Sequence, residues 1–336
     1  MARQPHRMLH LIAIYLAMIV VCLGAYTRLK HAGLGCPDWP KCFENWIVHA
    51  NITSPALSYE ASEKAWIEMI HRYAAGILGI IVFMLRANTP KKETHTILNI
   101  ACVMIIIQAL FGMWTVTWRL HPLAVMPHLI GGMTITTLLC VDYQKKFITR
   151  QSMVIPPQVY TSLQILWVAV FIQIVIGGWT SANYAALVCP DFPKCQGQWF
   201  IPVDSLIQGF SWPFGFQSYE GGVISGEGRI AIHMTHRWGA LICTVLVARL
   251  SWQVIQLKMQ LPKVFVQWFR VLTSCFAIQI TLGILNVRWQ LPISIAVGHN
   301  IVALALLITV SVLLHIAAHH KILNSKITEY YQHATI

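Results

Sequence analysis

The sequence contains eight apolar runs of about 20 residues, the length that an α-helix needs to cross the hydrocarbon core of a bilayer. The runs are 8–28, 67–86, 96–118, 123–143, 160–181, 230–250, 264–287 and 293–318. Only 11% of the residues are charged, whereas a soluble domain has about 25%, and the mean hydropathy is +0.60. The sequence therefore predicts an all-α integral membrane protein with eight transmembrane helices.

The positions of Lys and Arg predict the orientation of these helices. On the side of both termini the basic residues lie in short loops and tails, whereas on the other side they are spread over two long loops, about 29–66 and 182–229. The positive-inside rule then places both termini in the cytoplasm, which in a bacterial cell means the inner (plasma) membrane. The net charge of +12 follows this pattern of loops. We therefore expect the lipid bilayer, and no nucleic acid, as a partner.

The chain also repeats itself. Residues 24–42 read GAYTRLKHAGLGCPDWPKC, and residues 177–195, which begin 153 positions later, read GGWTSANYAALVCPDFPKC. Further along, EMIHR at 68–72 matches HMTHR at 233–237. Chance similarity between apolar helices would recover Leu and Ile rather than Cys, Asp and His in the same order.

The repeat predicts two four-helix halves, residues 1–150 and 151–336. Because four is an even number of crossings, both halves enter the membrane from the same side. The expected relation between them is a pseudo-two-fold axis along the membrane normal. The predicted fold is therefore two related four-helix bundles.

Four histidines recur at one depth in the predicted helices. His71 and His128 each lie five or six residues from the outer end of a span, or roughly 8–9 Å at 1.5 Å per residue. His236 and His299 occupy the same places in the second half. Histidine commonly holds heme iron, and facing helices of a bundle build such sites. Each half therefore presents a pair of candidate ligands for one heme.

Two other interpretations of the histidines stay open. Each imidazole can simply hydrogen-bond to a neighbouring helix. Zinc is the other alternative, but it requires three or four converging ligands, often with cysteine. The histidines come in pairs, and the cysteines inside the helices share no pattern with them, which favours heme. We expect those cysteines to be packing residues: Cys22, Cys102, Cys140, Cys243 and Cys275.

The halves differ at one informative position. Glu68 stands three residues before His71, whereas His233 stands three residues before His236. Residues at i and i+3 share a helix face, so we expect Glu68 to point into the same cavity as His71. A carboxyl group in a membrane is costly, and here it can accept a proton or stabilise a developing cation. The alternative is a carboxylate that hydrogen-bonds to a loop at the water boundary. The asymmetry predicts one reactive site and one electron-transfer site.

An arginine follows the first histidine of each half, at positions 72 and 237. A guanidinium group suits carboxylates, so Arg72 and Arg237 are candidates to bind the propionates of a heme. The alternative is that both side chains only extend to the membrane interface.

Two cysteine pairs lie in the predicted outer loops. Cys36 and Cys42 bracket PDWPK, and Cys189 and Cys195 bracket PDFPK. Disulfides persist on the outer face of a membrane, so a structural disulfide in each loop is one interpretation. A redox-active disulfide is the second, because a strained and exposed disulfide is more easily reduced. A zinc site made of all four cysteines is the third.

The order of these motifs resembles that of the heme A synthase family over nearly the whole chain. The motifs that carry the resemblance are TRL…GLGCPDWPKC, EMIHRYAAG, PHLIGG, HMTHRWG and GHN. The resemblance implies oxidation of the methyl group at pyrrole carbon 8 of heme O to a formyl group, with water as the source of oxygen. This reaction completes heme A for cytochrome oxidases. Heme O synthase and oxidase assembly factors are the protein partners that such a pathway suggests.

The resemblance also assigns the two heme sites. It implies a heme b cofactor at His236 and His299, the substrate heme O at His71 and His128, and the essential carboxylate at Glu68. The cysteine pair in the first outer loop of some family members corresponds to Cys36 and Cys42, and the resemblance implies that this pair takes part in electron transfer. This sequence departs from the family pattern because it keeps the second pair, Cys189 and Cys195, which leaves a structural role open for both pairs.

Two functions from other classes are alternatives. The first is a diheme electron-transfer protein like a cytochrome b. Its hemes would be expected near both faces of the membrane, whereas here all four histidines lie toward one face. The second is a heme-binding assembly or transport protein without catalysis. The asymmetry at Glu68 favours an enzyme over both.

Overall fold

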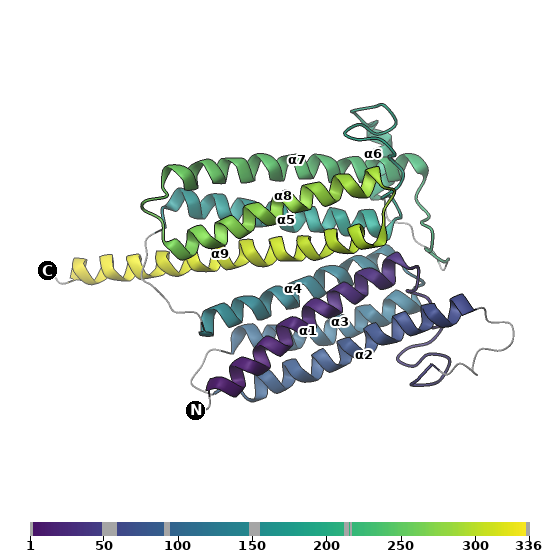
Figure 1. Ribbon diagram of the computed structural model, residues 1–336, viewed down its shortest axis with the longest axis horizontal. Helices are drawn as coiled ribbons and strands as arrows, with labels where there is room; N and C mark the ends of the chain where they lie inside the picture. Colours follow the sequence, from purple (N-terminus) through teal and green to yellow (C-terminus); the bar gives the residue numbers. More distant parts are fainter. Residues whose placement is uncertain are drawn as a thin grey trace.

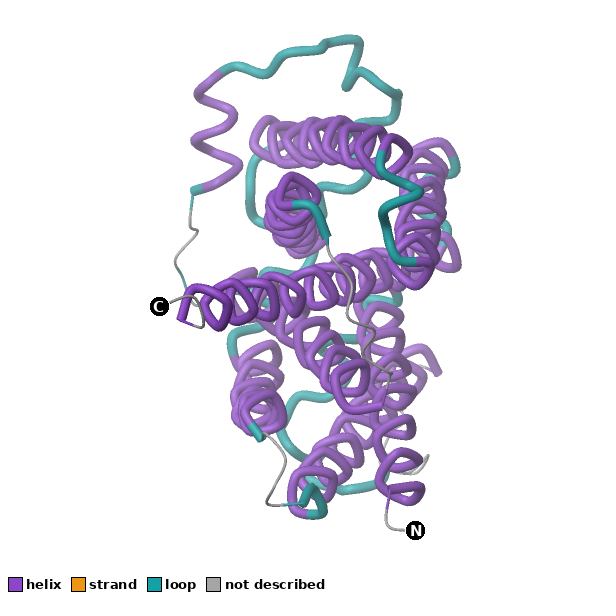
Figure 2. The backbone as a smooth tube through the Cα atoms, turned by 90° about the vertical axis from the view of Figure 1, so that its left-hand side faces the viewer, coloured by secondary structure: helices purple, strands orange, loops and turns teal. Residues whose placement is uncertain are grey.

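The computed structural model describes residues 3–48, 59–90, 95–147, 155–211, 215 and 217–333. Within these residues the chain folds into nine α-helices, with two isolated β-bridges and no longer strand (Figures 1 and 2). The helices are α1 (Arg3–Leu29), α2 (Tyr59–Ala87), α3 (Thr96–Thr117), α4 (Pro122–Phe147), α5 (Pro157–Ala182), α6 (Val203–Phe210), α7 (Gly226–Gln256), α8 (Lys263–Arg288) and α9 (Ile293–His333).

Eight of these helices are long and apolar enough to cross a membrane. The exception is α6, which has 8 residues and lies between α5 and α7. Every predicted span coincides with one of the long helices, so the prediction of an all-α protein with eight transmembrane helices is confirmed. The chain is therefore a multi-pass membrane protein.

Several of the helices begin earlier than the apolar runs that predicted them, and α2 and α7 show why. Helix α2 begins at Tyr59 rather than near residue 67, and its first turns are polar, with an ion pair of 2.9 Å between Glu60 and Lys64. Helix α7 begins at Gly226, where the Ser225 hydroxyl accepts a hydrogen bond from the backbone N–H of Gly228. Hydropathy detects only the lipid-facing part of a helix, whereas pairing and capping allow it to continue further.

The helices of the first half and those of the second half form two neighbouring groups (Figure 1). One group is α1–α4, and the other contains α5, α7, α8 and α9; contacts between the groups run through α1, α4, α5 and α9. The first group has an apolar core of its own, whereas the core of the second group also includes Val21 of α1 and Met133 of α4. The boundary expected near residue 150 lies outside the described residues, and the pseudo-two-fold axis stays a prediction.

The backbone repeats in detail at equivalent places. Helix α3 is followed by the C-cap residue Trp118 and α8 by the C-cap residue Trp289, and in both cases the next two residues have positive φ angles. His31 and its counterpart Tyr184 also have positive φ angles, of 51° and 54°. The duplication seen in the sequence therefore extends to local backbone conformation.

The start of α1 and the end of α9 lie at the same end of the molecule (Figure 1), which is the end that faces the viewer in Figure 2. Both cysteine-containing loops and α6 lie at the opposite end (Figure 1). This arrangement agrees with an even number of crossings.

Candidate functional site

A cavity of about 1550 Å³ lies between the helices and is lined by both halves of the chain. All four predicted histidines line it, together with Glu68, Arg72 and Arg237. Its lining also includes apolar side chains from both halves, among them Val21 and Met133 from the first and Val170 and Ile174 from the second. One continuous space therefore connects the two candidate sites.

The histidines face one another in pairs, as predicted. The ring centres of His71 and His128 are 6.2 Å apart, and those of His236 and His299 are 6.4 Å apart. Two imidazoles that bind one iron from opposite sides need nitrogens about 4 Å apart, and hence ring centres about 6 Å apart, because each metal–nitrogen bond is about 2 Å. Both pairs fit this requirement, so each can hold the iron of one heme.

Each of these histidines lies directly against a glycine of the preceding long helix. An ideal Cβ atom on the glycine would lie 3.0–3.2 Å from the Cε1 atom of the histidine ring, which is tighter than most contacts in proteins. The pairs are Gly24 with His71, Gly112 with His128, Gly177 with His236 and Gly283 with His299. Gly24 and Gly177 are equivalent residues of the repeat at 24–42 and 177–195, but only the structure shows that these four glycines give the imidazoles their space.

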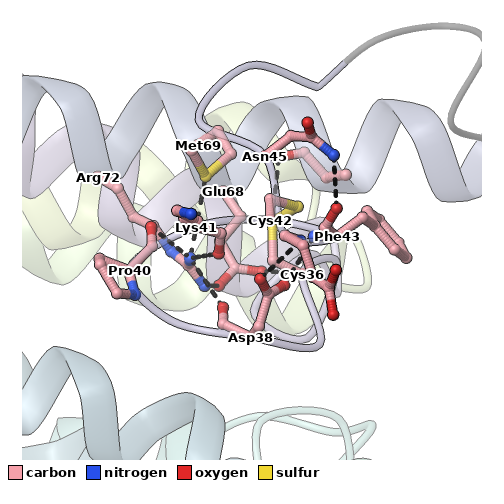
Figure 3. Close-up of a disulfide and its surroundings, with 12 residues drawn as sticks. Cys36, Asp38, Pro40, Lys41, Cys42, Phe43, Asn45, Glu68, Met69 and Arg72 are labelled. Carbon is pink, nitrogen blue, oxygen red and sulfur yellow. Dashed lines mark hydrogen bonds and ion pairs between the residues drawn. A yellow bond between two sulfur atoms is a disulfide. The ribbon is translucent and has the colours of Figure 1, made fainter.

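Glu68 is buried and lies beside the first cysteine loop (Figure 3). One carboxylate oxygen, Oε2, accepts a hydrogen bond of 2.9 Å from the backbone N–H of Cys36. The other, Oε1, is paired with the Nη2 group of Arg72. The carboxylate thus lines the cavity of His71, as predicted, and also bonds to a loop, which was the alternative. The part of Glu68 in a reaction stays a prediction.

Arg72 binds the same loop through its second amino group (Figure 3). Its Nη1 group donates hydrogen bonds of 2.7–3.2 Å to the backbone carbonyl oxygens of Asp38, Pro40 and Lys41. The sequence did not predict this contact, because backbone acceptors leave no pattern in the residue types. Two expectations were stated for Arg72: that it binds a heme propionate, and that it only extends to the membrane interface. The binding of a propionate stays a prediction.

Arg237 makes the equivalent contacts in the second half. Its Nη1 group donates hydrogen bonds of 2.6–3.2 Å to the carbonyl oxygens of Asp191, Pro193 and Lys194. Its Nη2 group lies 3.3 Å from the carbonyl oxygen of Cys189, where the first half has a carboxylate. Each arginine therefore fastens one outer loop to its helix.

Both cysteine pairs form disulfides, Cys36–Cys42 and Cys189–Cys195. All four cysteines are buried. The four-cysteine zinc site is therefore not formed, and no group of three or more His, Cys, Asp or Glu that could hold a metal ion occurs among the described residues. The exposure on which the redox-active interpretation depended is absent in both pairs.

An aspartate stabilises the turn that follows each loop. Asp38 accepts hydrogen bonds from the backbone N–H groups of Phe43 and Glu44. Asp191 accepts the equivalent bonds from Gln196 and Gly197. The backbone N–H of Gly197 in particular lowers the pKa of the Asp191 carboxyl below its ordinary value.

Comparison with known proteins identifies the family. The profile of the COX15-CtaA family, described as cytochrome oxidase assembly protein, matches residues 7–311 of the 336-residue chain. The chain belongs to this family. The COX15-CtaA profile covers both histidine pairs, Glu68 and both cysteine loops, so the whole candidate site lies inside the matched region.

Similar proteins cover nearly the same length. A heme A synthase of Shewanella oneidensis is 39% identical over 318 residues, which is 89% of this chain and 92% of that protein. The heme A synthase of Wolbachia pipientis is 27% identical, over 84% of this chain and 90% of its own length. That of Geobacillus kaustophilus is 25% identical, over 84% and 83%.

Proposed function

We propose that the chain is a heme A synthase, an oxidoreductase that converts the pyrrole carbon-8 methyl group of heme O into a formyl group for the maturation of cytochrome oxidase. The observation that carries the proposal is a single buried carboxylate, Glu68, in a cavity that holds two imidazole pairs. Membership of the COX15-CtaA family and the names of the similar proteins support it.

The stoichiometry shows what such a site must provide. A methyl group and one water molecule yield a formyl group, four protons and four electrons. The protons need an acceptor near the methyl carbon, and the cationic character that develops there needs a negative charge. Glu68 is the acidic side chain of the described cavity lining that can meet both needs.

We assign the substrate heme to His71 and His128, because Glu68 is on the same helix as His71 and lies in the same half. We assign heme b to His236 and His299, where the position equivalent to Glu68 is a buried histidine, His233. A heme bound there supplies one-electron redox chemistry. The residues of this half would then hold the cofactor, and the described residues that this half contributes to the cavity lining include no carboxylate.

The surroundings of Glu68 suit a group that must keep its position during the reaction. The N–H of Cys36 and the guanidinium of Arg72 each hold one of its oxygens. Charge-assisted hydrogen bonds of this kind are about twice as strong as neutral ones. The loop therefore fixes the carboxylate from the outer side, while the cavity leaves it accessible to the substrate.

We further propose that the protein lies in the inner (plasma) membrane with both termini in the cytoplasm. The distribution of basic loops supports this orientation. Heme O synthase and cytochrome oxidase assembly factors are the proposed protein partners, since one supplies the substrate and the others use the product.

The experiment that tests the function is conversion of heme O. Membranes of cells that make heme O but lack a heme A synthase are compared with and without this chain, and extracted hemes are separated and identified by mass. The proposal expects heme A only when the chain is present. Unchanged heme O in membranes that contain the folded protein would refute it.

A further inference from the structure

The four helices that pack against the heme histidines share a second position. It lies four residues, or about one helical turn, before the glycine under each imidazole. Three of these helices carry glutamine there, and the first carries valine: Gln108, Gln173, Gln279 and Val20. All four side chains line the cavity. The first half and the second half thus differ at a position that neither the proposed reaction nor the loop contacts explain.

Gln173 contacts the histidine of the neighbouring helix directly. Its side-chain amide donates a hydrogen bond of 2.8 Å to the backbone carbonyl oxygen of His236 and lies 3.1 Å from ring atom Nδ1. The space for this amide comes from Gly239, because an ideal Cβ atom there would lie 2.1 Å from the glutamine Oε1 atom. Glutamine and glycine therefore act as a matched pair beside His236.

Related contacts support the other two glutamine positions. The Gln108 amide lies against Gly131, where an ideal Cβ would be 1.8 Å from it, and 3.5 Å from the carbonyl oxygen of Pro127, the residue before His128. The Gln279 amide lies 3.2 Å from a ring nitrogen of His299. Three of the four histidines thus have a glutamine amide close to the imidazole ring or to a backbone carbonyl oxygen next to it.

His71 is the exception. The α1 position is Val20, whose side chain has no hydrogen-bonding group, and the α2 position that corresponds to Gly239 is Ala74. Both members of the glutamine–glycine pair are therefore replaced together. The backbone carbonyl of Val20 is the polar group that α1 offers to this imidazole.

A hydrogen-bonding partner outside the metal site fixes the orientation of a histidine ligand, and its removal typically weakens metal binding by about 10–100-fold. We propose that Gln173 and Gly239 are positioning residues that retain the heme at His236, and that Val20 and Ala74 make His71 the exchangeable ligand. The inference rests on the proposed function, because a substrate heme must leave after each reaction whereas a cofactor must stay.

The first test removes the amide from the second half. Gln173→Leu is compared with the parent protein and with Gln164→Leu, an exposed glutamine on the same helix. Purified full-length protein is mixed with excess apomyoglobin, and the heme remaining is identified by mass, which separates heme b from heme O or heme A. We expect heme b to leave at least about tenfold faster from Gln173→Leu, with release of the other heme unchanged.

The second test adds the amide to the first half. The expected result is slower release of heme, which misfolding would not produce. The double variant Val20→Gln/Ala74→Gly is compared with Val20→Leu/Ala74→Gly, which has the same glycine but no amide. Release of heme O or heme A is expected to slow by about tenfold in the glutamine variant alone.

The outcomes separate this inference from the proposed function. Parent protein that contains heme b but never heme O or heme A would overturn the proposed function. Parent protein with both kinds of heme, in which Gln173→Leu and the glutamine double variant release them at parental rates, would overturn the positioning roles alone.

Discussion

The two halves of this protein share one arrangement of arginine, histidine and outer loop, but they differ at the position three residues before the first histidine, which is Glu68 in one half and His233 in the other. In both, an arginine one residue after the histidine donates hydrogen bonds to three carbonyl oxygens of a disulfide-containing loop. In the first half its other amino group meets the Glu68 carboxylate, and in the second it meets the carbonyl of Cys189. If the proposed assignment holds, one carboxylate and the contacts that hold it are what distinguish the reactive site from the site that only holds a heme.

A glycine in the first loop contributes to the difference. Gly35 lies so close to α2 that an ideal Cβ would be 2.6 Å from the backbone carbonyl of Lys64. The equivalent residue in the second loop is Val188. Because Gly35 lets the loop approach, the N–H of the next residue, Cys36, can reach Glu68.

The largest expected effect is the loss of a heme. His236→Ala should abolish stable binding of heme b, because an iron held from two sides loses one ligand, whereas His71→Ala should retain it. Heme content per chain, from absorbance and extraction of purified protein, measures the difference. Equal retention of heme b by both variants would contradict the assignment of heme b to the second half.

Replacement of the carboxylate should have the next largest effect. Glu68→Gln keeps the shape of the side chain but removes its charge and basicity, so formation of heme A should fall by about 100-fold or more. Heme b should remain bound, and heme O should accumulate. His233→Gln is the matched change in the second half and should reduce formation of heme A less. A larger loss from His233→Gln than from Glu68→Gln would contradict the division of tasks.

A third, smaller effect concerns the approach of the first loop. Gly35→Val should push the loop away from α2 and disturb the hydrogen bond from Cys36 to Glu68. Because a displacement of about 1 Å can cost up to about 100-fold in rate, we expect a fall of about tenfold in heme A formation with heme b unchanged. The reciprocal change Val188→Gly is the control. Parental activity in the Gly35→Val variant would show that the close approach has no catalytic role.

The smallest effect lies in the second loop. Backbone N–H groups lower the pKa of the Asp191 carboxyl in the folded state. Above its ordinary pKa of 3.8 the ionised carboxylate therefore stabilises the folded state, and this stabilisation is lost as the pH falls through the lower pKa of the folded protein. Asp191→Asn should therefore unfold at a slightly lower temperature than the parent at pH 7, and the gap should close below about pH 4. Thermal unfolding of purified protein at both pH values measures this. A gap that widens in acid would reverse the assigned sign.

The sequence predicted the eight helices because lipid exposure requires long apolar runs, which hydropathy detects. The histidine pairs were also predicted, because the repeat gives each half two histidines at the same depth: His71 and His128 in the first, His236 and His299 in the second. The hydrogen bonds of the Arg72 guanidinium group could not be predicted from the sequence. Their acceptors are three backbone carbonyl oxygens, which every residue type has. The early start of α2 and the short helix α6 were likewise missed, because polar turns and an 8-residue helix leave no spanning pattern.

The most direct test of the division between the halves is the heme content of the intact protein. The chain is produced in cells that make heme O, purified, and its hemes are extracted, quantified per chain and identified by mass. We predict one heme b together with heme O or heme A. Two equivalents of heme b, with no heme O or heme A, would contradict it and indicate a diheme electron-transfer protein.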